Sequence, residues 1–197
     1  RLGRDYMVID KLKTHFGVAD LGMKRVKIGR KLGRVDKAKK TLVKNWKWVY
    51  EDAIYCMMDK FDNVGDVGKN KRFLESDEVF KEALRVFLYD GLFRSSDNIL
   101  RNILIDKTGK VMSIDEGDIY GKRKQIFGKH DWFKKATNIV KIRKCVNEII
   151  DEFDLDAKVD IVVKNLELYG FNDAILEEAR SRFANYRAIV LGELKTE

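Results

Sequence analysis

Three side chains that carry oxygen atoms lie near one another in the sequence. Asp97 precedes Asn102 by five residues, and Asp115 follows after two short apolar runs. Carboxylate and amide oxygens are the ligands that Mg²⁺ takes in proteins, and a further carboxylate can orient and deprotonate a hydroxyl group. An Asp, an Asn and a second Asp are therefore the groups that Mg²⁺-dependent phosphoryl transfer requires.

The two apolar runs predict a β-hairpin that would position these side chains. Residues 102–105 and 110–114 are rich in Ile, Leu and Val, and residues 106–109 (Asp-Lys-Thr-Gly) have the composition of a tight turn. Antiparallel pairing about this turn sets Ile105 opposite Lys110.

The same pairing sets Asn102 roughly opposite Ser113, so Asn102 and Asp115 should lie at the open end of the hairpin, with Asp97 in the loop leading to it. A second interpretation stays open. Asp and Asn favour loops in any protein, and the segment would then be an ordinary hairpin with solvent-exposed flanks.

The spacing Asp-x-x-x-x-Asn, followed by strand, turn, strand and Asp, resembles the catalytic loop and metal-binding loop of the protein-kinase-like fold. Residues 95–102 (S-S-D-N-I-L-R-N) are similar to the catalytic loops of HipA-like bacterial kinases and of phosphatidylinositol kinases. The resemblance implies that Asp97 is the catalytic residue, and that Asn102 and Asp115 bind Mg²⁺ and, with it, ATP.

The chain departs from these families at several positions. No His or Arg directly precedes Asp97, Ile99 replaces a common His, and Glu116 stands where most kinases have the Phe of Asp-Phe-Gly. The sequence also has no evident counterpart of the nucleotide-binding Lys and its partner Glu. We therefore expect an N-terminal lobe that is reduced, missing or supplied by residues outside this chain.

Helical patterns follow on both sides of the hairpin. A helix over 77–91, capped by Ser76, should deliver the chain to the candidate loop. Helices are predicted over 132–153, 155–168 and 173–195. No strand pattern interrupts these last segments, as is typical of a helical lobe.

The first seventy residues predict a mixed segment. We expect strands over 6–9 and 24–28, a helix over 45–61 and a loop over 62–70. The helix rests on apolar residues at three- and four-residue spacing, namely Trp46, Val49, Ala53, Cys56, Met57 and Phe61.

These elements predict an α+β fold with two parts. Residues 1–45 would form a small basic N-terminal α/β segment, a reduced or partial N-terminal lobe. Residues 46–197 would form a mostly helical, kinase-like C-terminal lobe with a catalytic hairpin, whose catalytic loop spans 94–118.

The amino-acid composition indicates the kind of compartment in which the protein is found. The 197 residues include no proline and two cysteines, Cys56 and Cys145, too few for a disulfide framework. We therefore expect an intracellular, reducing compartment, either cytoplasmic or in an assembly such as a virion. No apolar run approaches the length of a membrane span, and the first residues do not resemble a signal peptide.

The net charge of +8 is unevenly distributed. Residues 1–50 hold 15 basic and 4 acidic residues, whereas residues 151–197 hold 6 basic and 11 acidic ones. The basic region suggests a nucleotide, a nucleic acid or an acidic protein as partner, or else an ordinary solvated surface.

The leading hypothesis is a divergent kinase-like phosphotransferase that uses ATP and Mg²⁺ to phosphorylate a hydroxyl acceptor. One alternative is a catalytically inactive, kinase-like structural or scaffolding module that is a subunit of a larger assembly. The other is a basic nucleic-acid-binding protein, suggested by residues 1–50 and the nearby Trp46 and Trp48.

Overall fold

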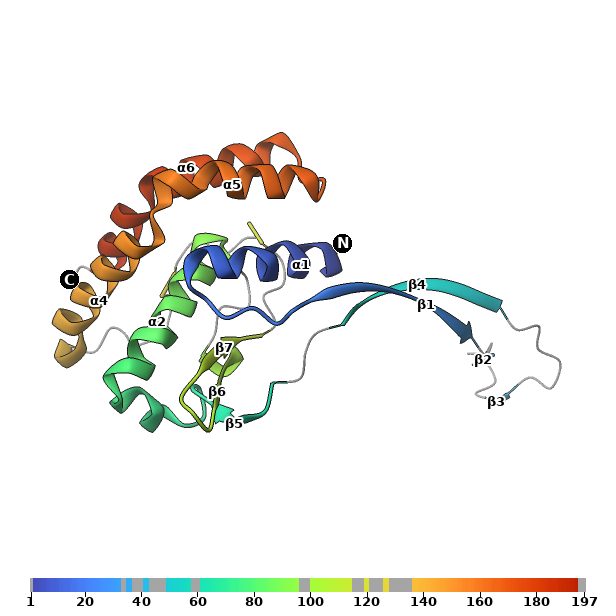
Figure 1. Ribbon diagram of the computed structural model, residues 1–197, viewed down its shortest axis with the longest axis horizontal. Coiled ribbons are helices and arrows are strands. Elements are labelled where there is room, and N and C mark those ends of the chain that lie inside the picture. The colour runs from blue at the N-terminus through green and yellow to red at the C-terminus, as the bar shows by residue number, and fades with distance from the viewer. Residues whose placement is uncertain are drawn as a thin grey trace.

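The protein has a mostly helical α+β fold, as predicted, with a small three-stranded antiparallel sheet (Figure 1). The computed structural model describes residues 2–32, 35–36, 41–42, 49–57, 61–95, 100–114, 119–120, 126–127 and 136–194. It describes side chains over 5–23, 61–95, 100–114, 119–120, 126–127 and 139–194.

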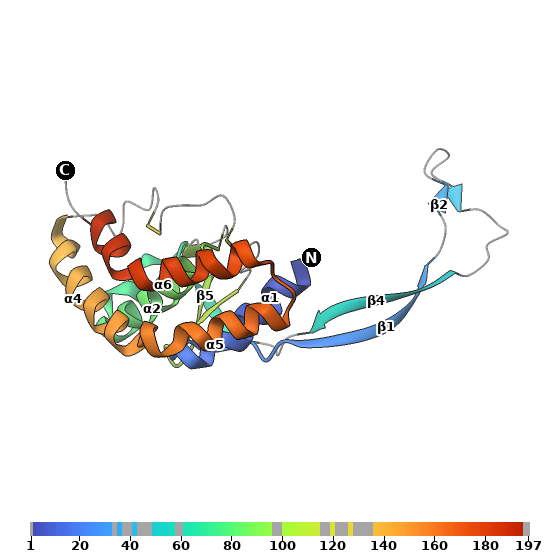
Figure 2. The ribbon, with the colours of Figure 1, turned by 90° about the horizontal axis from the view of Figure 1, so that it is seen from above.

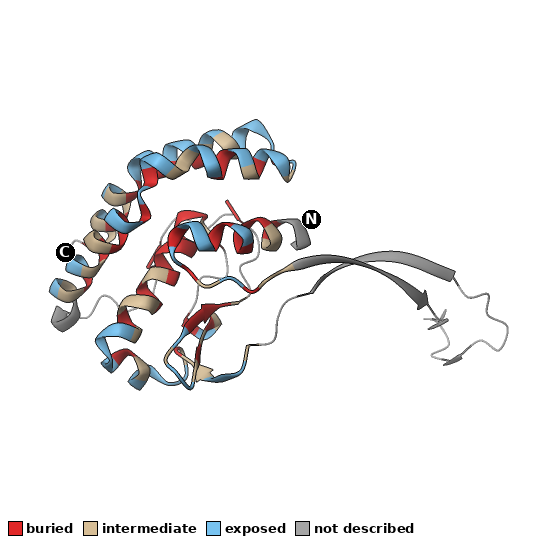
Figure 3. Ribbon diagram, in the orientation of Figure 1, coloured by how far each residue is buried: buried red, intermediate tan, exposed pale blue. Residues whose placement is uncertain are grey.

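Helix α2 (Asp77–Leu92) runs through the core and confirms the helix predicted over 77–91. The Ser76 side chain accepts a hydrogen bond from the Val79 N–H at 3.4 Å, and two acidic residues in the first turn suit the positive end of the helix dipole. Every residue from Val86 to Leu92 is buried, so the C-terminal half of α2 is enclosed on all sides (Figure 3).

Three helices form the C-terminal part of the chain: α4 (Ala136–Phe153), α5 (Leu155–Leu168) and α6 (Asp173–Glu193). They confirm the helices predicted there, although residues 131–135 lie outside the described part. Helices α5 and α6 lie side by side in Figures 1 and 2. On α4, Ile142 is buried, whereas Val140 is 78% exposed.

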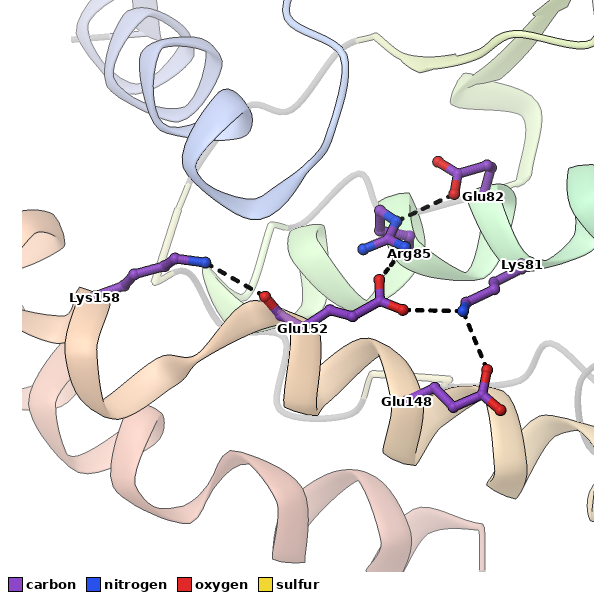
Figure 4. A network of polar contacts seen from close by, with 6 residues as sticks. All are labelled: Lys81, Glu82, Arg85, Glu148, Glu152 and Lys158. Carbon is purple, nitrogen blue, oxygen red and sulfur yellow. Dashed lines mark hydrogen bonds and ion pairs between the residues drawn. The ribbon is translucent and has the colours of Figure 1, made fainter.

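A network of ion pairs joins α2 to α4 (Figure 4). The Lys81 ammonium contacts both Glu148 and Glu152 at 3.1 and 3.0 Å, and the Arg85 guanidinium contacts Glu152 and Glu82. The hydrogen bonds to Glu152 and Glu148 raise the pKa of Lys81. The hydrogen bond from Arg85, followed by that from Lys81, lowers the pKa of Glu152 against the effect of partial burial.

The three-stranded sheet contains β5 (Asn63–Asp66), β6 (Ile103–Asp106) and β7 (Val111–Ser113), with β6 in the middle. The two strands predicted for the hairpin are thus confirmed. The loop predicted over 62–70 is wrong for β5, because the Gly- and Asn-rich composition of that segment suggested only a turn.

The strand predicted over 6–9 is wrong, because these residues lie in helix α1 (Leu2–Lys13), which continues into a short 3-10 helix, η1 (Thr14–Phe16). Among residues 5–13, whose side chains the structure describes, the buried ones are Asp5, Val8, Ile9, Asp10, Leu12 and Lys13. Half of them are charged, so the helical stripe does not show as an apolar pattern, and the short apolar run looks like a strand.

The helix predicted over 45–61 is wrong for residues 49–57, which form strand β4 (Val49–Met57). This strand pairs antiparallel with β1 (Lys24–Leu32), from Lys24 opposite Met57 to Leu32 opposite Val49, and so confirms the strand predicted over 24–28. Its β-branched and aromatic residues favour a strand once a partner supplies the backbone hydrogen bonds. Strands β2 (Val35–Asp36) and β3 (Thr41–Leu42) pair between them.

One hydrophobic core joins α1, α2, the small sheet and the C-terminal helices. Its centre is an aromatic cluster in which Phe16 contacts Tyr89, Phe153 and Phe183, with ring centroids 5.4 to 6.2 Å apart. Within the described residues, every helix is too short or too polar to cross a membrane. The division of the chain near residue 45 stays a prediction.

Candidate functional site

The hairpin of β6 and β7 is shifted by one residue from the predicted pairing. Ile105 lies opposite Val111 and Ile103 opposite Ser113, whereas Lys110 belongs to the turn. The Asp106 N–H donates to the Lys110 carbonyl at 3.0 Å, so Asp106 and Lys110 close the turn in place of the predicted pair Ile105 and Lys110.

The turn end of the hairpin uses its carboxylate internally. Asp106 Oδ1 accepts hydrogen bonds from the Thr108 N–H and hydroxyl at 2.8 and 2.6 Å, and from the Lys110 N–H at 3.0 Å. The Thr108 hydroxyl is the main cause that lowers the pKa of Asp106. Gly109 has a φ of 86°, a left-handed conformation that favours glycine. Asp106 therefore stabilises the turn.

The open end of the hairpin lies beside Asn102. This half-buried residue ends the 3-10 helix η3 (Leu100–Asn102), and its carbonyl accepts a hydrogen bond from the Ile114 N–H at 2.9 Å. The structure therefore places Asn102 next to the strand that leads to Asp115. Asp97 and Asp115 themselves lie outside the described residues, so the meeting of all three side chains stays a prediction.

A second hydrogen bond connects residue 120 with the end of α2. The Tyr120 N–H donates to the carbonyl of Phe93, the residue directly after α2, at 2.8 Å. The Ser95 N–H donates to the Asp90 carbonyl at 3.0 Å, which holds the chain as it leaves α2. The described residues that flank 96–99 and 115–118 thus meet at two points, one at the end of α2 and one at Asn102.

Helix α6 contacts the chain on the α2 side of this region. The Arg182 guanidinium donates two hydrogen bonds to the Gly91 carbonyl, at 3.0 and 2.6 Å, and Arg94 forms an ion pair with Glu178. The Glu193 carboxylate accepts hydrogen bonds from the backbone N–H groups of residues 126 and 127, at 2.8 to 3.0 Å. One helix therefore fixes both the entry to the candidate loop and the chain beyond residue 120.

Sequence reasoning missed a charged group that contacts the hairpin. Lys13, the last residue of α1, is fully buried and donates a hydrogen bond to the Ser113 carbonyl at 3.1 Å. Its only signal in the sequence is its place on the buried stripe of α1, eight residues after Asp5, and that signal is visible only once α1 is recognised as a helix.

A metal site formed by three or more His, Cys, Asp or Glu residues is not found among the residues that the structure describes. The two carboxylates of the predicted site, Asp97 and Asp115, are not among those residues. Asn102 is, and its position at the open end of the hairpin suits an oxygen ligand. Comparison of the chain with known protein families, curated proteins and solved structures finds no match.

Proposed function

We propose that this protein is a divergent kinase-like phosphotransferase whose site lies at the open end of the β6–β7 hairpin. The observation that carries the proposal is a pair of backbone hydrogen bonds near that end. The Ile114 N–H binds the Asn102 carbonyl, and the Tyr120 N–H binds the Phe93 carbonyl. The segments that contain Asp97 and Asp115 are thereby joined at both flanks.

Chain length strengthens the argument. Segments 96–99 and 115–118 contain four residues each, and four residues reach about 14 Å when fully extended. If both ends are anchored at shared points, the two segments would keep Asp97 and Asp115 in one neighbourhood beside Asn102. This supports the convergence of oxygen ligands that the hairpin pattern predicts.

The proposed roles follow from the chemistry of each group. Asp97 orients the acceptor hydroxyl and accepts its proton, and Asn102 and Asp115 hold Mg²⁺ with the phosphates of ATP. Bound Mg²⁺ would supply positive charge to the phosphate oxygens. Asp106, the acidic residue within the hairpin (103–113), is unsuited to this work because its carboxylate binds the turn.

The experiment is calorimetric titration of the full chain with ATP, with and without Mg²⁺. We expect Mg²⁺-dependent binding by the wild type, and loss of at least about 90% of the affinity in Asn102→Ala, since a ligand to the ion is removed. Asn185→Ala is the matched control, because Asn185 is exposed on α6 and donates to the Ser181 carbonyl. It should bind as the wild type does.

Three outcomes would contradict the proposal. The absence of Mg²⁺-dependent binding by the wild type would favour an inactive, scaffolding module. Equal binding by the wild type and Asn102→Ala would place the nucleotide elsewhere. Binding without phosphate transfer to any hydroxyl compound would leave a nucleotide-binding module without kinase activity.

A further inference from the structure

The Lys13 ammonium is enclosed in the protein interior. Its side chain has 0% exposure, and Nζ lies 3.1 Å from the Ser113 carbonyl oxygen and 3.6 Å from Asp10 Oδ1. Asp10 is itself 3% exposed and accepts hydrogen bonds from the backbone N–H groups of Leu21 and Met23, at 2.6 and 2.8 Å. Lys13 therefore connects the end of α1 and the chain leading to β1 with the last residue of β7.

Stability alone does not account for a charged pair at this place. A buried ion pair loses so much hydration that apolar residues of similar size often stabilise a protein as well or better. What an ammonium adds is direction, because its hydrogen bond to a carbonyl fixes that carbonyl in space. Here the carbonyl belongs to Ser113.

Ser113 lies at the point where the hairpin meets the proposed metal site. It is the last residue of β7, it pairs with Ile103, and the next N–H along the chain binds the Asn102 carbonyl. Asp115 follows two residues later. A displacement of Ser113 would therefore move both proposed metal ligands relative to one another.

We propose that Lys13 is a positioning residue that holds the end of β7 in the geometry required for Mg²⁺ binding. The inference rests on the proposed function for the role of the metal, but the contact that it invokes belongs to the fold. Through this contact, α1 sets the geometry of a site that lies about a hundred residues further along the chain.

The test compares Lys13→Met with Tyr89→Phe in the full chain. Lys13→Met keeps the length of the side chain and removes the ammonium. Tyr89→Phe is the matched control, because it removes another buried hydrogen bond to α1, from the Tyr89 hydroxyl to the Ile9 carbonyl, and keeps both groups of the Lys13–Ser113 hydrogen bond. If Lys13→Met does not fold, the double variant Asp10→Asn/Lys13→Met takes its place. The double variant no longer buries the Asp10 carboxylate without its cation.

The first measurement is amide hydrogen exchange, which needs no nucleotide. In Lys13→Met, the Ile114 amide should exchange about ten- to a hundredfold faster than in the wild type, relative to the amides of α2. Tyr89→Phe should leave that ratio unchanged. The inference would be overturned if the exchange rate of the Ile114 amide rose no more than the rates of the α2 amides. It would also be overturned if that rate rose as much in Tyr89→Phe.

The second measurement separates metal binding from nucleotide binding, with Mn²⁺ and ADP as probes. Lys13→Met should weaken Mn²⁺ binding in the presence of ADP about tenfold or more, and weaken metal-free ADP binding much less. Equal weakening of both would indicate general loss of structure and overturn the positioning role. A wild type that binds neither probe contradicts the proposed function, and hydrogen exchange alone then decides whether Lys13 positions β7.

Discussion

Two residues of the hairpin illustrate how similar side chains serve different ends. Asp106 and Asn102 lie at opposite ends of β6, and both carry oxygen atoms one carbon beyond Cβ. The Asp106 carboxylate accepts hydrogen bonds from three donors of the turn. The backbone carbonyl of Asn102 accepts a hydrogen bond from the Ile114 N–H, just after β7. The hydrogen bonds of the turn therefore make the Asp106 carboxylate unsuited to bind a ligand.

Gly91 is the residue whose size matters most at the entry to the candidate loop. A Cβ atom there would lie 2.7 Å from Ile126 Cγ2 and 2.9 Å from the Tyr186 hydroxyl oxygen. We therefore predict that Gly91→Ala lowers the free energy of unfolding by about 1–3 kcal/mol, as overpacked core positions do. Urea denaturation measures the change.

Gly192→Ala is the control for this prediction. Gly192 also lies in a helix, and no atom is within 4 Å of a Cβ placed there. Alanine favours helices over glycine, so this variant should be as stable as the wild type or more stable by up to about 1 kcal/mol. A Gly91→Ala protein as stable as Gly192→Ala would show that α2, α6 and residue 126 do not approach so closely.

Among the elements, α6 does most to order the chain around the proposed site. It contacts the end of α2 through Arg182, the start of the candidate loop through Glu178, and residues 126–127 through Glu193. The Tyr186 hydroxyl also donates to the Leu88 carbonyl within the core. The last helix of the chain thus supports a region that lies about eighty residues earlier.

The ion pairs between α2 and α4 predict how stability depends on pH. The pKa of Glu152 is lowered from 4.5, chiefly by the hydrogen bond from Arg85. Its contribution is therefore present above about pH 4.5 and is lost as the pH falls through the lower pKa of the folded state. The pKa of Lys81 is raised above 10.5, so its contribution is lost only as the pH rises beyond that value.

The measurement is the free energy of unfolding of the wild type and of Glu152→Gln, from about pH 7 to about pH 3. The wild type should be more stable at neutral pH by up to about 1 kcal/mol, because Glu152 is partly exposed, and the difference should vanish in acid. A difference that grows as the pH falls would contradict the assignment of Glu152 as an ionised partner of Arg85.

At the scale of the whole molecule, the sequence predicts best the elements with purely local signals. Ser76 before an apolar stripe marks the start of α2, Gly170 separates α5 from α6, and the Asp-to-Gly turn marks the hairpin. Each of these elements has a signal in its own residues: a helix cap, a turn, or apolar residues at helical spacing. The predicted place of Asn102, at the open end of the hairpin, follows from such signals.

The elements that the sequence misses depend on distant contacts. Strand β4 needs β1, about twenty-five residues earlier, to replace the helical hydrogen bonds that its apolar spacing suggests. Helix α1 is hidden because Asp5, Asp10 and Lys13 occupy its buried face. Lys13 contacts the hairpin through the Ser113 carbonyl, a backbone group that no residue type in the sequence identifies.

The central claim is that Mg²⁺ binds at the open end of the β6–β7 hairpin, and paramagnetic broadening of amide signals by Mn²⁺ tests it most directly. The broadening falls steeply with distance, and the two ends of the hairpin lie on the order of 10 Å apart, since each strand residue adds about 3.4 Å. Titration of the ¹⁵N-labelled full chain, in the presence of ADP, therefore distinguishes them.

We predict that the amides of Asn102 and Ile114 broaden first, and that those of Thr108 and Gly109 at the turn remain sharp until much more Mn²⁺ is added. Asn102→Ala should remove the effect. Broadening that begins at the turn around Asp106, or that spreads evenly over the acidic residues of α5 and α6, would contradict a metal site at the open end and, with it, the proposed function.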